Sequence, residues 1–428
     1  MKILVVSNLY PPDVCGGYEL CCQQAVDALR ARGHEVLVLT TAPRRPVDAE
    51  PDVRRLLKLV DLWDAYTDER STQSTLRLRD AEAFQISAFN VHLLTQVLED
   101  FQPDVAYLWM LLGIGGLGLV GCLHHLGVPW VWHLMDDVPQ RLCMTFFQVR
   151  SQLAREFSKQ FRGSFLACSQ HVLDDIARSG FALGDHVEVL PNWITGERFA
   201  TGAPRTRKPD EPLRIMACGM VNRRKGIDVL IEAAARLRNA GSDAFQIDIY
   251  GTIEDSTLPA LALKHGLTRQ VVFKGPRPHH EVRRLYSDYD VFAFPTHEHE
   301  PFGIVPLEAM AAGCVPVITR RCGVAEFLVH GVHCIKATRT PKAFAEVFRM
   351  ILGGEVDLGP LALRGRELVW RHYHLDAIIP NIERALQNAS RHVPENPGTA
   401  DEAYRLALLA EKLVRVFMQE EYLAGTPA

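Results

Sequence analysis

The chain has 428 residues, of which 47% are hydrophobic and 23% are charged, and its formal net charge at pH 7 is -4. This length exceeds what one hydrophobic core usually supports, so a soluble enzyme of two domains is expected. The small net charge gives no electrostatic footprint for nucleic acid, which we therefore exclude as a partner. Ten cysteines without a Cys-x-x-Cys pair or a His/Cys cluster indicate reduced thiols in a cytoplasmic protein, with neither disulfide bonds nor structural zinc.

Short apolar runs alternate with helical patterns in the first half of the chain, which is typical of a parallel α/β sheet. The expected elements are, in chain order, a strand at 2–7, a helix at 17–32, a strand at 35–40, a helix at 83–101 and a strand at 105–112. Residues 41–79 lack such a pattern and are interpreted as a functional loop or an embellishment. Further strands are expected at 130–134, 164–168 and 187–190, with a helix after Ser169.

Residues 105–135 contain no Asp, Glu, Lys or Arg, a length that could span a membrane as one helix. The glycines between 113 and 121 and the Gly-Val-Pro break at 127–129 favour a strand, a helix and a second strand instead.

The glycines Gly113, Gly115 and Gly118 formally match the dinucleotide-binding pattern G-x-G-x-x-G, with Asp136 and Asp137 downstream, so an NAD-dependent oxidoreductase is a remote alternative. Close packing of a core helix explains the same glycines, and the aspartates follow a further apolar strand. We therefore favour other functions.

A polar, proline-rich segment at 201–212 is expected to link a first domain, 1–200, to a second domain, 213–370. Residues 371–428 are expected to form helices that pack back on the first domain. In the second domain we expect strands at 213–218, 245–250, 271–274, 291–294 and 315–319, and helices at 226–239 and 305–312. After residue 343 the chain is expected to be helical to 387, with a last helix at 401–422.

The residues most indicative of function follow the expected strand at 291–294. Open parallel sheets bind ligands beyond the carboxyl ends of their strands, where helix N-termini favour phosphate. Backbone N-H groups that could meet a diphosphate there belong to Phe302, Gly303, Ile304 and Val305. Glu308, in the first turn of the expected helix, could accept hydrogen bonds from ribose hydroxyls, and Glu300 could reach the hydroxyls of a bound sugar.

Two glutamates with seven residues between them resemble the carboxylate pair of family 4 of the retaining glycosyltransferases, the group 1 enzymes that include glycogen synthases and mannosyltransferases. The resemblance covers residues 1–350 and implies the GT-B fold, an α/β architecture of two Rossmann-like, doubly wound domains facing a central cleft. It implies transfer of a hexose from a UDP-, GDP- or ADP-sugar to a hydroxyl of a glycan, lipid-linked or small-molecule acceptor. It also implies retention of anomeric configuration without a metal or other cofactor.

Residues 219–226, Gly-Met-Val-Asn-Arg-Arg-Lys-Gly, are similar to the basic phosphate-binding loop of that family. By this resemblance Lys225 would neutralise the leaving diphosphate. The family usually places an arginine directly after the first glycine, where this chain has Met220, so Arg223 or Arg224 would have to substitute for it.

Three segments of the first domain also resemble the family. Gly16 and Gly17 resemble its glycine loop, which faces the donor phosphates and sugar; paired glycines permit positive φ and close backbone approach. Residues 191–194, with Phe199, match the loop leading to the second domain. Asp136 takes the place of the aspartate in a His-Asp pair near the sugar, while Met135 stands at the histidine position. His133 either takes over that role or is a core histidine pointing the other way.

Two alternatives share the expected fold: a catalytically degenerate nucleotide-sugar-binding protein and a nucleotide-sugar epimerase. Met220 and Met135 keep the degenerate reading open, whereas Glu300, Glu308 and Lys225 favour activity. Because many members of the family act on lipid-linked acceptors, peripheral contact with the inner membrane face is a further expectation.

Overall fold

A computed structural model describes residues 1–43, 45–59, 85–136, 138–143, 148–196, 205, 207–208, 211–392 and 397–425. The chain forms two compact units. The first contains Met1–Cys168, Val172–Leu190 and Ile379–Ala428, and the second contains Ser169–His171 and Pro191–Ile378. Asp137, Phe199 and most of the expected linker at 201–212 lie outside the described residues.

The first unit is built on a sheet of seven parallel strands in the order β3-β2-β1-β4-β5-β6-β7. The strands are β1 (Lys2–Val6), β2 (Glu35–Thr41), β3 (Val53–Leu57), β4 (Val105–Leu108), β5 (Trp130–Leu134), β6 (Ser164–Ala167) and β7 (Val187–Val189). The strand order reverses between β1 and β4, where Val6 pairs with both Leu39 and Leu108. Ligands of open α/β sheets bind beyond the strand ends at such a switch point.

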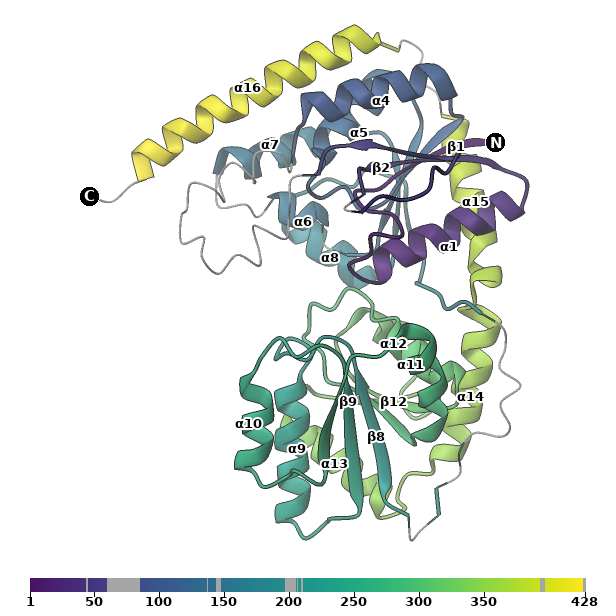
Figure 1. The fold of residues 1–428 in the computed structure, drawn as a ribbon, viewed down its shortest axis with the longest axis vertical. Helices are drawn as coiled ribbons and strands as arrows, with labels where there is room; N and C mark the ends of the chain where they lie inside the picture. Colours follow the sequence, from purple (N-terminus) through teal and green to yellow (C-terminus); the bar gives the residue numbers. More distant parts are fainter. Residues whose placement is uncertain are drawn as a thin grey trace. The chain divides into compact units, whose positions relative to one another are not determined.

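Helices connect these strands and flank the sheet (Figure 1). They are α1 (Gly17–Ala31), α4 (Ala88–Phe101), α5 (Gly116–His125), α6 (Val138–Cys143), α7 (Gln148–Ser158) and α8 (Gln170–Arg178). The helix expected from residue 83 begins only at Ala88, because the Ser87 hydroxyl accepts a hydrogen bond from the N-H of Asn90 and caps the first turn.

The uncharged stretch at 105–135 forms β4, α5 and β5, as the glycine and proline breaks indicate. Of the helices in the described ranges, none combines the length and apolarity that crossing a membrane requires. Gly115 adopts φ +76°, and a Cβ there would lie 2.4 Å from the backbone nitrogen of Ser87. A Cβ on Gly118 would lie 3.2 Å from Ile86. Packing therefore accounts for these glycines, and no space remains beside them for a pyrophosphate.

The segment at 41–79, expected to be a loop or embellishment, contains the edge strand β3, which pairs with β2. Its sequence, Val-Arg-Arg-Leu-Leu, lacks strict alternation because charged residues protect a sheet edge from further pairing. Residues 60–79 of the same segment lie outside the described residues. The side chain of Arg55 donates to the carbonyls of Tyr10 and Pro11, at 3.3 and 2.6 Å, and so fixes the loop after β1.

The second unit has a sheet of six parallel strands in the order β10-β9-β8-β11-β12-β13. They are β8 (Leu213–Cys218), β9 (Phe245–Tyr250), β10 (Val271–Gly275), β11 (Val291–Phe294), β12 (Val315–Thr319) and β13 (Ile335–Ala337). The order reverses between β8 and β11, so the loops that follow these two strands are neighbours at the switch point. The core is continuous across the sheet, with Ile215, Ile247, Val291 and Val317 fully buried.

The helices of the second unit are α9 (Ile227–Asn239), α10 (Thr257–Lys264), α11 (His279–Leu285), α12 (Val305–Ala311), α13 (Pro341–Leu352) and α14 (Leu358–His372). Short 3-10 turns occupy Tyr286–Asp288 and Gly323–Glu326. The sequence pattern did not predict α10, α11 or β13. Each is short, so none offers the several helical turns or the apolar alternation on which periodicity depends.

Two helices follow α14. The first, α15 (Leu375–Ser390), begins in the second unit and continues in the first, where Glu383 accepts hydrogen bonds from Arg32 and lies 2.9 Å from His34 Nε2. The second, α16 (Ala400–Gly425), packs along α4 and α5 in the first unit (Figure 1).

Replacing Gly115 with alanine should destabilise the protein because the new methyl group meets the Ser87 backbone in a left-handed conformation. We expect a loss of about 2 kcal/mol or more in the free energy of unfolding. Gly33→Ala is the matched control, since Gly33 also has positive φ but its Cβ would meet no atom within 4 Å. Thermal unfolding should rank Gly115→Ala clearly below Gly33→Ala; equal midpoints would contradict the packing explanation.

Candidate active site

Two loops of the second unit meet at its switch point, one after β8 and one after β11. Gly226 caps α9 with φ +74°, and a Cβ there would lie 1.9 Å from the carbonyl oxygen of Pro295. Arg339, just after β13, donates to the carbonyls of Pro295 and Arg223, at 3.0 and 2.5 Å. Only glycine allows this approach, and Arg339 holds the two loops together.

This contact brings Lys225 and Glu300 together. Lys225 Nζ lies 2.6 Å from Glu300 Oε2, and the hydroxyl of Thr296 donates to the same oxygen at 2.8 Å. Glu300 is only 8% exposed. Burial alone would raise the pKa of Glu300, but the charge and hydrogen bond of Lys225 and the hydrogen bond of Thr296 hold that pKa below its ordinary value. The carboxylate is therefore ionised at neutral pH.

The side-chain contacts of Glu300 within the described residues all use Oε2. Its other oxygen, Oε1, consequently remains available as an acceptor. A carboxylate held in this way can orient a hydroxyl-bearing ligand without a change of its own conformation.

His297 extends the cluster. Its Nε2 lies 3.2 Å from the guanidinium of Arg224 and 3.9 Å from Glu300 Oε2. Burial lowers the pKa of His297 to about 4; Glu300 opposes this, while Arg224, Lys225 and His299 add to it. The imidazole is thus neutral at neutral pH.

The two candidate arginines have different surroundings. Arg223 donates to Asp255 at 3.0 Å and to Thr257 at 3.3 Å, and it also lies 3.6 Å from Asp228. Its charge is therefore already matched by carboxylates. Arg224 lies beside His297 and Glu300. It is therefore the better candidate to take the role of the arginine that the family usually has at the position of Met220.

The loop from Phe302 to Val305 leads into α12. The N-H groups of these four residues donate no hydrogen bond within the part of the chain that the structure describes. Gly303 has φ +87°, and a Cβ there would lie 2.7 Å from the ring of Phe294. The Phe302 side chain is buried against Phe327, so only its backbone can serve a ligand.

Glu308 lies in the first turn of α12 at the same end of the sheet. Its Oε1 is 2.5 Å from Nε2 of His279, and its Oε2 accepts from the hydroxyl of Tyr286 at 3.4 Å. The hydrogen bond to Glu308 raises the pKa of His279, against the effect of burial. Both glutamates of the pair therefore have fixed partners.

In the first unit, the structure corrects the reason given for Gly16 and Gly17. Neither has positive φ: Gly16 is extended at φ -170°, and Gly17 is the first residue of α1. The N-H groups of Cys15 and Gly16 instead donate to the buried carboxylate of Glu19, at 3.2 and 2.9 Å, as in a capping box. A Cβ on Gly16 would meet no atom within 4 Å, so the loop surface is open there.

His133 is a core histidine. The centroid of its ring lies 4.7 Å from that of Trp109 in a tilted arrangement, its Nδ1 lies 2.6 Å from the Tyr107 hydroxyl, and burial lowers its pKa to about 3. The neighbouring Asp136 accepts from the N-H of Val138 at 3.0 Å and so caps α6. Of the two, Asp136 alone is partly exposed in a loop after β5, where a ligand can reach it.

Sequence reasoning missed Thr296, His297, His279, Tyr286 and Arg339. Thr296 and His297 lie within the run of polar residues before Glu300, which was the available signal. The other three come from separate elements, and only the fold brings them to the site.

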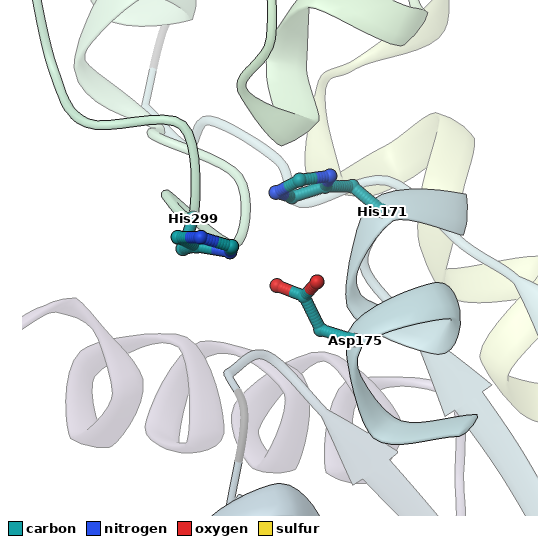
Figure 2. Close-up of side chains that lie close together, drawn as sticks. All are labelled: His171, Asp175 and His299. Carbon is teal, nitrogen blue, oxygen red and sulfur yellow. The ribbon is translucent and has the colours of Figure 1, made fainter. Parts of the chain in front are cut away.

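Possible metal ligands also occur near this site. His171 and Asp175 lie one turn apart on α8, and the ring of His171 stacks on that of His299 at 6.1 Å (Figure 2). Asp175 belongs to the first unit, so the second unit supplies two imidazoles. Catalytic zinc sites use three protein ligands, and we assign no metal to this pair.

Removing the partner of Glu300 should destabilise the protein, because it leaves a carboxylate that is mostly buried without a counter-charge. We expect Lys225→Met to cost about 3 kcal/mol at pH 7 and Lys225→Met/Glu300→Gln to recover most of this loss. The lowered pKa of Glu300 means that the ion pair stabilises above the ordinary glutamate pKa, about 4.3, and less in acid. Urea unfolding at pH 7 and pH 4 measures both effects; a constant loss at both values would contradict the pairing.

Comparison with known proteins agrees with this geometry. A model of the group 1 glycosyl transferases matches residues 201–359, and a model of the glycosyl transferase 4-like domain matches residues 16–193. Glycogen synthase from Mycobacterium tuberculosis is 29% identical over 375 residues, covering 82% of this chain and 86% of that protein.

Two solved structures share the fold across almost the whole chain. Sucrose-phosphate synthase from Thermosynechococcus elongatus has a TM-score of 0.68 at 19% identity and covers 90% of this chain and 98% of its own. HepE of Anabaena, solved in complex with UDP, has a TM-score of 0.65 at 18% identity, with 91% and 100% covered. The chain therefore belongs to the group 1 glycosyltransferases and has the GT-B fold.

Proposed function

We propose that the second unit binds a nucleotide sugar and that the enzyme transfers its hexose to an acceptor hydroxyl with retention of anomeric configuration. The observation that carries the proposal is the Lys225–Glu300 pair at the switch point, together with Arg224 and the N-H groups of the loop entering α12, which have no acceptor among the described residues. Fixed charges of both signs next to unpaired N-H groups suit a ligand that has a diphosphate and a sugar.

In this mechanism the bond from the anomeric carbon to the diphosphate breaks while the acceptor oxygen attacks on the same face of an oxocarbenium-like sugar. The acceptor proton passes to the departing phosphate oxygen. Lys225 and Arg224 stabilise the charge that develops on the diphosphate. Glu300 orients the sugar through its available Oε1, and Glu308 holds the ribose. In the first unit, Gly16 and Gly17 admit the phosphates and Asp136 contacts the transferred sugar.

We propose that no metal or other cofactor takes part. Lys225 and Arg224 supply two positive charges at the phosphate end, the role that a divalent ion has in other phosphate-transfer sites. Arg223 contributes less, since Asp228 and Asp255 already match its charge.

For the donor we propose a UDP-sugar first and an ADP- or GDP-sugar as alternatives, because HepE has been solved with UDP and with UDP-glucose. A thermal-shift panel of UDP, ADP, GDP and NAD identifies the base. The acceptor is a glycan, a lipid-linked sugar or a small molecule; a lipid-linked acceptor would bring the enzyme to the inner membrane face as a peripheral protein. Product analysis with each class separates these acceptors.

One observation favours a second candidate, a nucleotide-sugar-binding protein without turnover. Met220 stands at the expected arginine position and is 50% exposed, so the first part of the phosphate loop supplies no charge. Release of nucleoside diphosphate from a donor, with or without acceptor, separates the candidates. A donor that binds but yields no diphosphate with any acceptor class would favour the binding protein, and conversion to a sugar epimer would indicate an epimerase.

The two charged residues of the pair should be needed for turnover. We expect Glu300→Gln and Lys225→Ala each to lower kcat at least about 100-fold, as loss of a preorganised electrostatic contact does. Glu300→Gln keeps the size of the side chain and one oxygen that can accept from Lys225, and its thermal unfolding midpoint, measured beside the activity, shows whether the variant remains folded. Turnover is measured as nucleoside diphosphate released, and NMR of the product gives its anomeric configuration. Near-normal turnover in Glu300→Gln, or an inverted product, would overturn the mechanism.

Neighbouring arginines give a matched control for the phosphate end. Arg224→Ala should weaken binding of the nucleoside diphosphate about tenfold, since a charge-assisted hydrogen bond is lost. Arg223→Ala should change it much less. Isothermal titration calorimetry at one ionic strength measures the Kd of each variant for the nucleoside diphosphate. A larger increase in Kd for Arg223→Ala than for Arg224→Ala would assign the phosphate contact to Arg223.

A further inference from the structure

We infer that His279 is a positioning residue for the donor ribose, acting through Glu308 and adding a proton-dependent step to donor binding. The inference rests on the proposed function, because it takes Glu308 as the ribose acceptor. His279 lies at the start of α11, outside both loops that define the site, and no motif in the sequence marks it.

Glu308 is held by a hydrogen-bond donor at each of its carboxylate oxygens. An ionised carboxylate can only accept hydrogen bonds, so at 2.5 Å from Oε1 the Nε2 atom of His279 must carry a proton. The Tyr286 hydroxyl donates to Oε2 from the other side at 3.4 Å. Held by donors at both oxygens, the carboxylate has a fixed plane, and its remaining lone pairs point in fixed directions. A ribose hydroxyl then meets an acceptor that needs no reorganisation.

The charge of His279 depends on its neighbours. The groups that act on it are Glu308, which raises its pKa through the hydrogen bond and its charge, and Arg283, which lowers it. Arg283 is turned toward the carbonyl of Thr195, to which it donates. Besides His279, Glu308 faces Tyr286 and the thiol of Cys218, and burial keeps both of these neutral at physiological pH.

Because its pKa lies above the ordinary value of 6.5, His279 keeps its second proton to higher pH than a free imidazole does. Both forms donate from Nε2, so the position of Glu308 is kept in both. The protonated form adds a positive charge where an anionic nucleotide binds. Nucleotide affinity should therefore be higher below the pKa of His279 and decrease as pH rises through it.

Two alanine variants on the same helix test the position. His280 is the matched control: it is adjacent to His279 and exposed. Titration calorimetry of the full chain with UDP at pH 7 should show a Kd raised about three- to tenfold in His279→Ala, the loss expected for one hydrogen bond. His280→Ala should bind like the wild type, and His279→Gln, which retains a donor, should recover most of the affinity at pH 7.

A nucleotide without ribose hydroxyls tests the route. At pH 8.5, where the charge of His279 contributes least, the penalty of His279→Ala should be clearly smaller with 2′,3′-dideoxy-UDP than with UDP, because Glu308 then has no ribose hydroxyl from which to accept a hydrogen bond. Between pH 6 and pH 8.5 the ratio of Kd values, His279→Gln to His280→Ala, should fall toward one, since ionisation of UDP itself cancels in this ratio. If ADP or GDP gives the strongest thermal shift, that nucleotide and its dideoxy form replace UDP.

The outcomes separate the inference from the proposed function. Failure of the wild-type chain to bind UDP, ADP or GDP would overturn the proposed function and the inference with it. Two results would overturn the inference alone, provided that the wild type binds the nucleotide. One is an equal increase in Kd from His279→Ala for the ribose and dideoxy nucleotides, and the other is a ratio of Kd values, His279→Gln to His280→Ala, that does not change with pH.

Discussion

The close approach of the loops after β8 and β11 determines the chemistry of the second unit. Gly226 lies against the carbonyl of Pro295, and this contact leaves Lys225 within 2.6 Å of Glu300. Neither charge could be buried there alone, since an unpaired charge in such a position costs several kcal/mol. The pair therefore depends on the backbone contact. In turn, it keeps an ionised carboxylate at the carboxyl edge of the sheet before any ligand arrives.

Arg339 shows how this arrangement is secured. Its guanidinium binds one carbonyl from each loop, so loss of either hydrogen bond would allow Lys225 and Glu300 to separate. Electrostatic catalysis requires charges that are already oriented, because reorientation during the reaction would consume the stabilisation that they offer. Arg339 would not itself contact the reacting atoms, but it supports Glu300, which would contact the sugar. The same reasoning applies to Arg55 in the first unit, which fixes the loop before Gly16.

The predictable parts of this protein are those encoded locally. Buried parallel strands consist mostly of apolar residues, so the strands at 213–218, 245–250, 291–294 and 315–319 were predicted with the bounds that the structure shows. The glutamate pair and the basic loop are also local patterns, and both lie at the switch point. By contrast, β3 carries arginines at a sheet edge, and β13 has three residues, so neither gives a periodic signal.

The contacts that give each site residue its role could not be predicted, because they join distant parts of the chain. Nothing near Arg223 in the sequence shows that Asp255 already binds it, and nothing near Glu308 points to His279. The positive φ expected for Gly16 and Gly17 was also wrong, again because the sequence does not show which contacts form. A glycine pair in sequence suggests positive φ, but here Glu19 caps the helix and extended backbone suffices.

Glu300 and Glu308 are separated by seven residues but are held by partners of different kinds. Glu300 is paired with the ammonium group of Lys225, whereas Glu308 is paired with the imidazole of His279, whose pKa it raises. In a nucleotide-sugar enzyme this difference would make the sugar end and the ribose end of the donor site respond differently to pH. The sugar end, at Glu300, would keep its charge balance as pH changes, and His297 beside it stays neutral. The ribose end would respond to pH through the imidazole of His279, so pH should affect donor binding more than the transfer step.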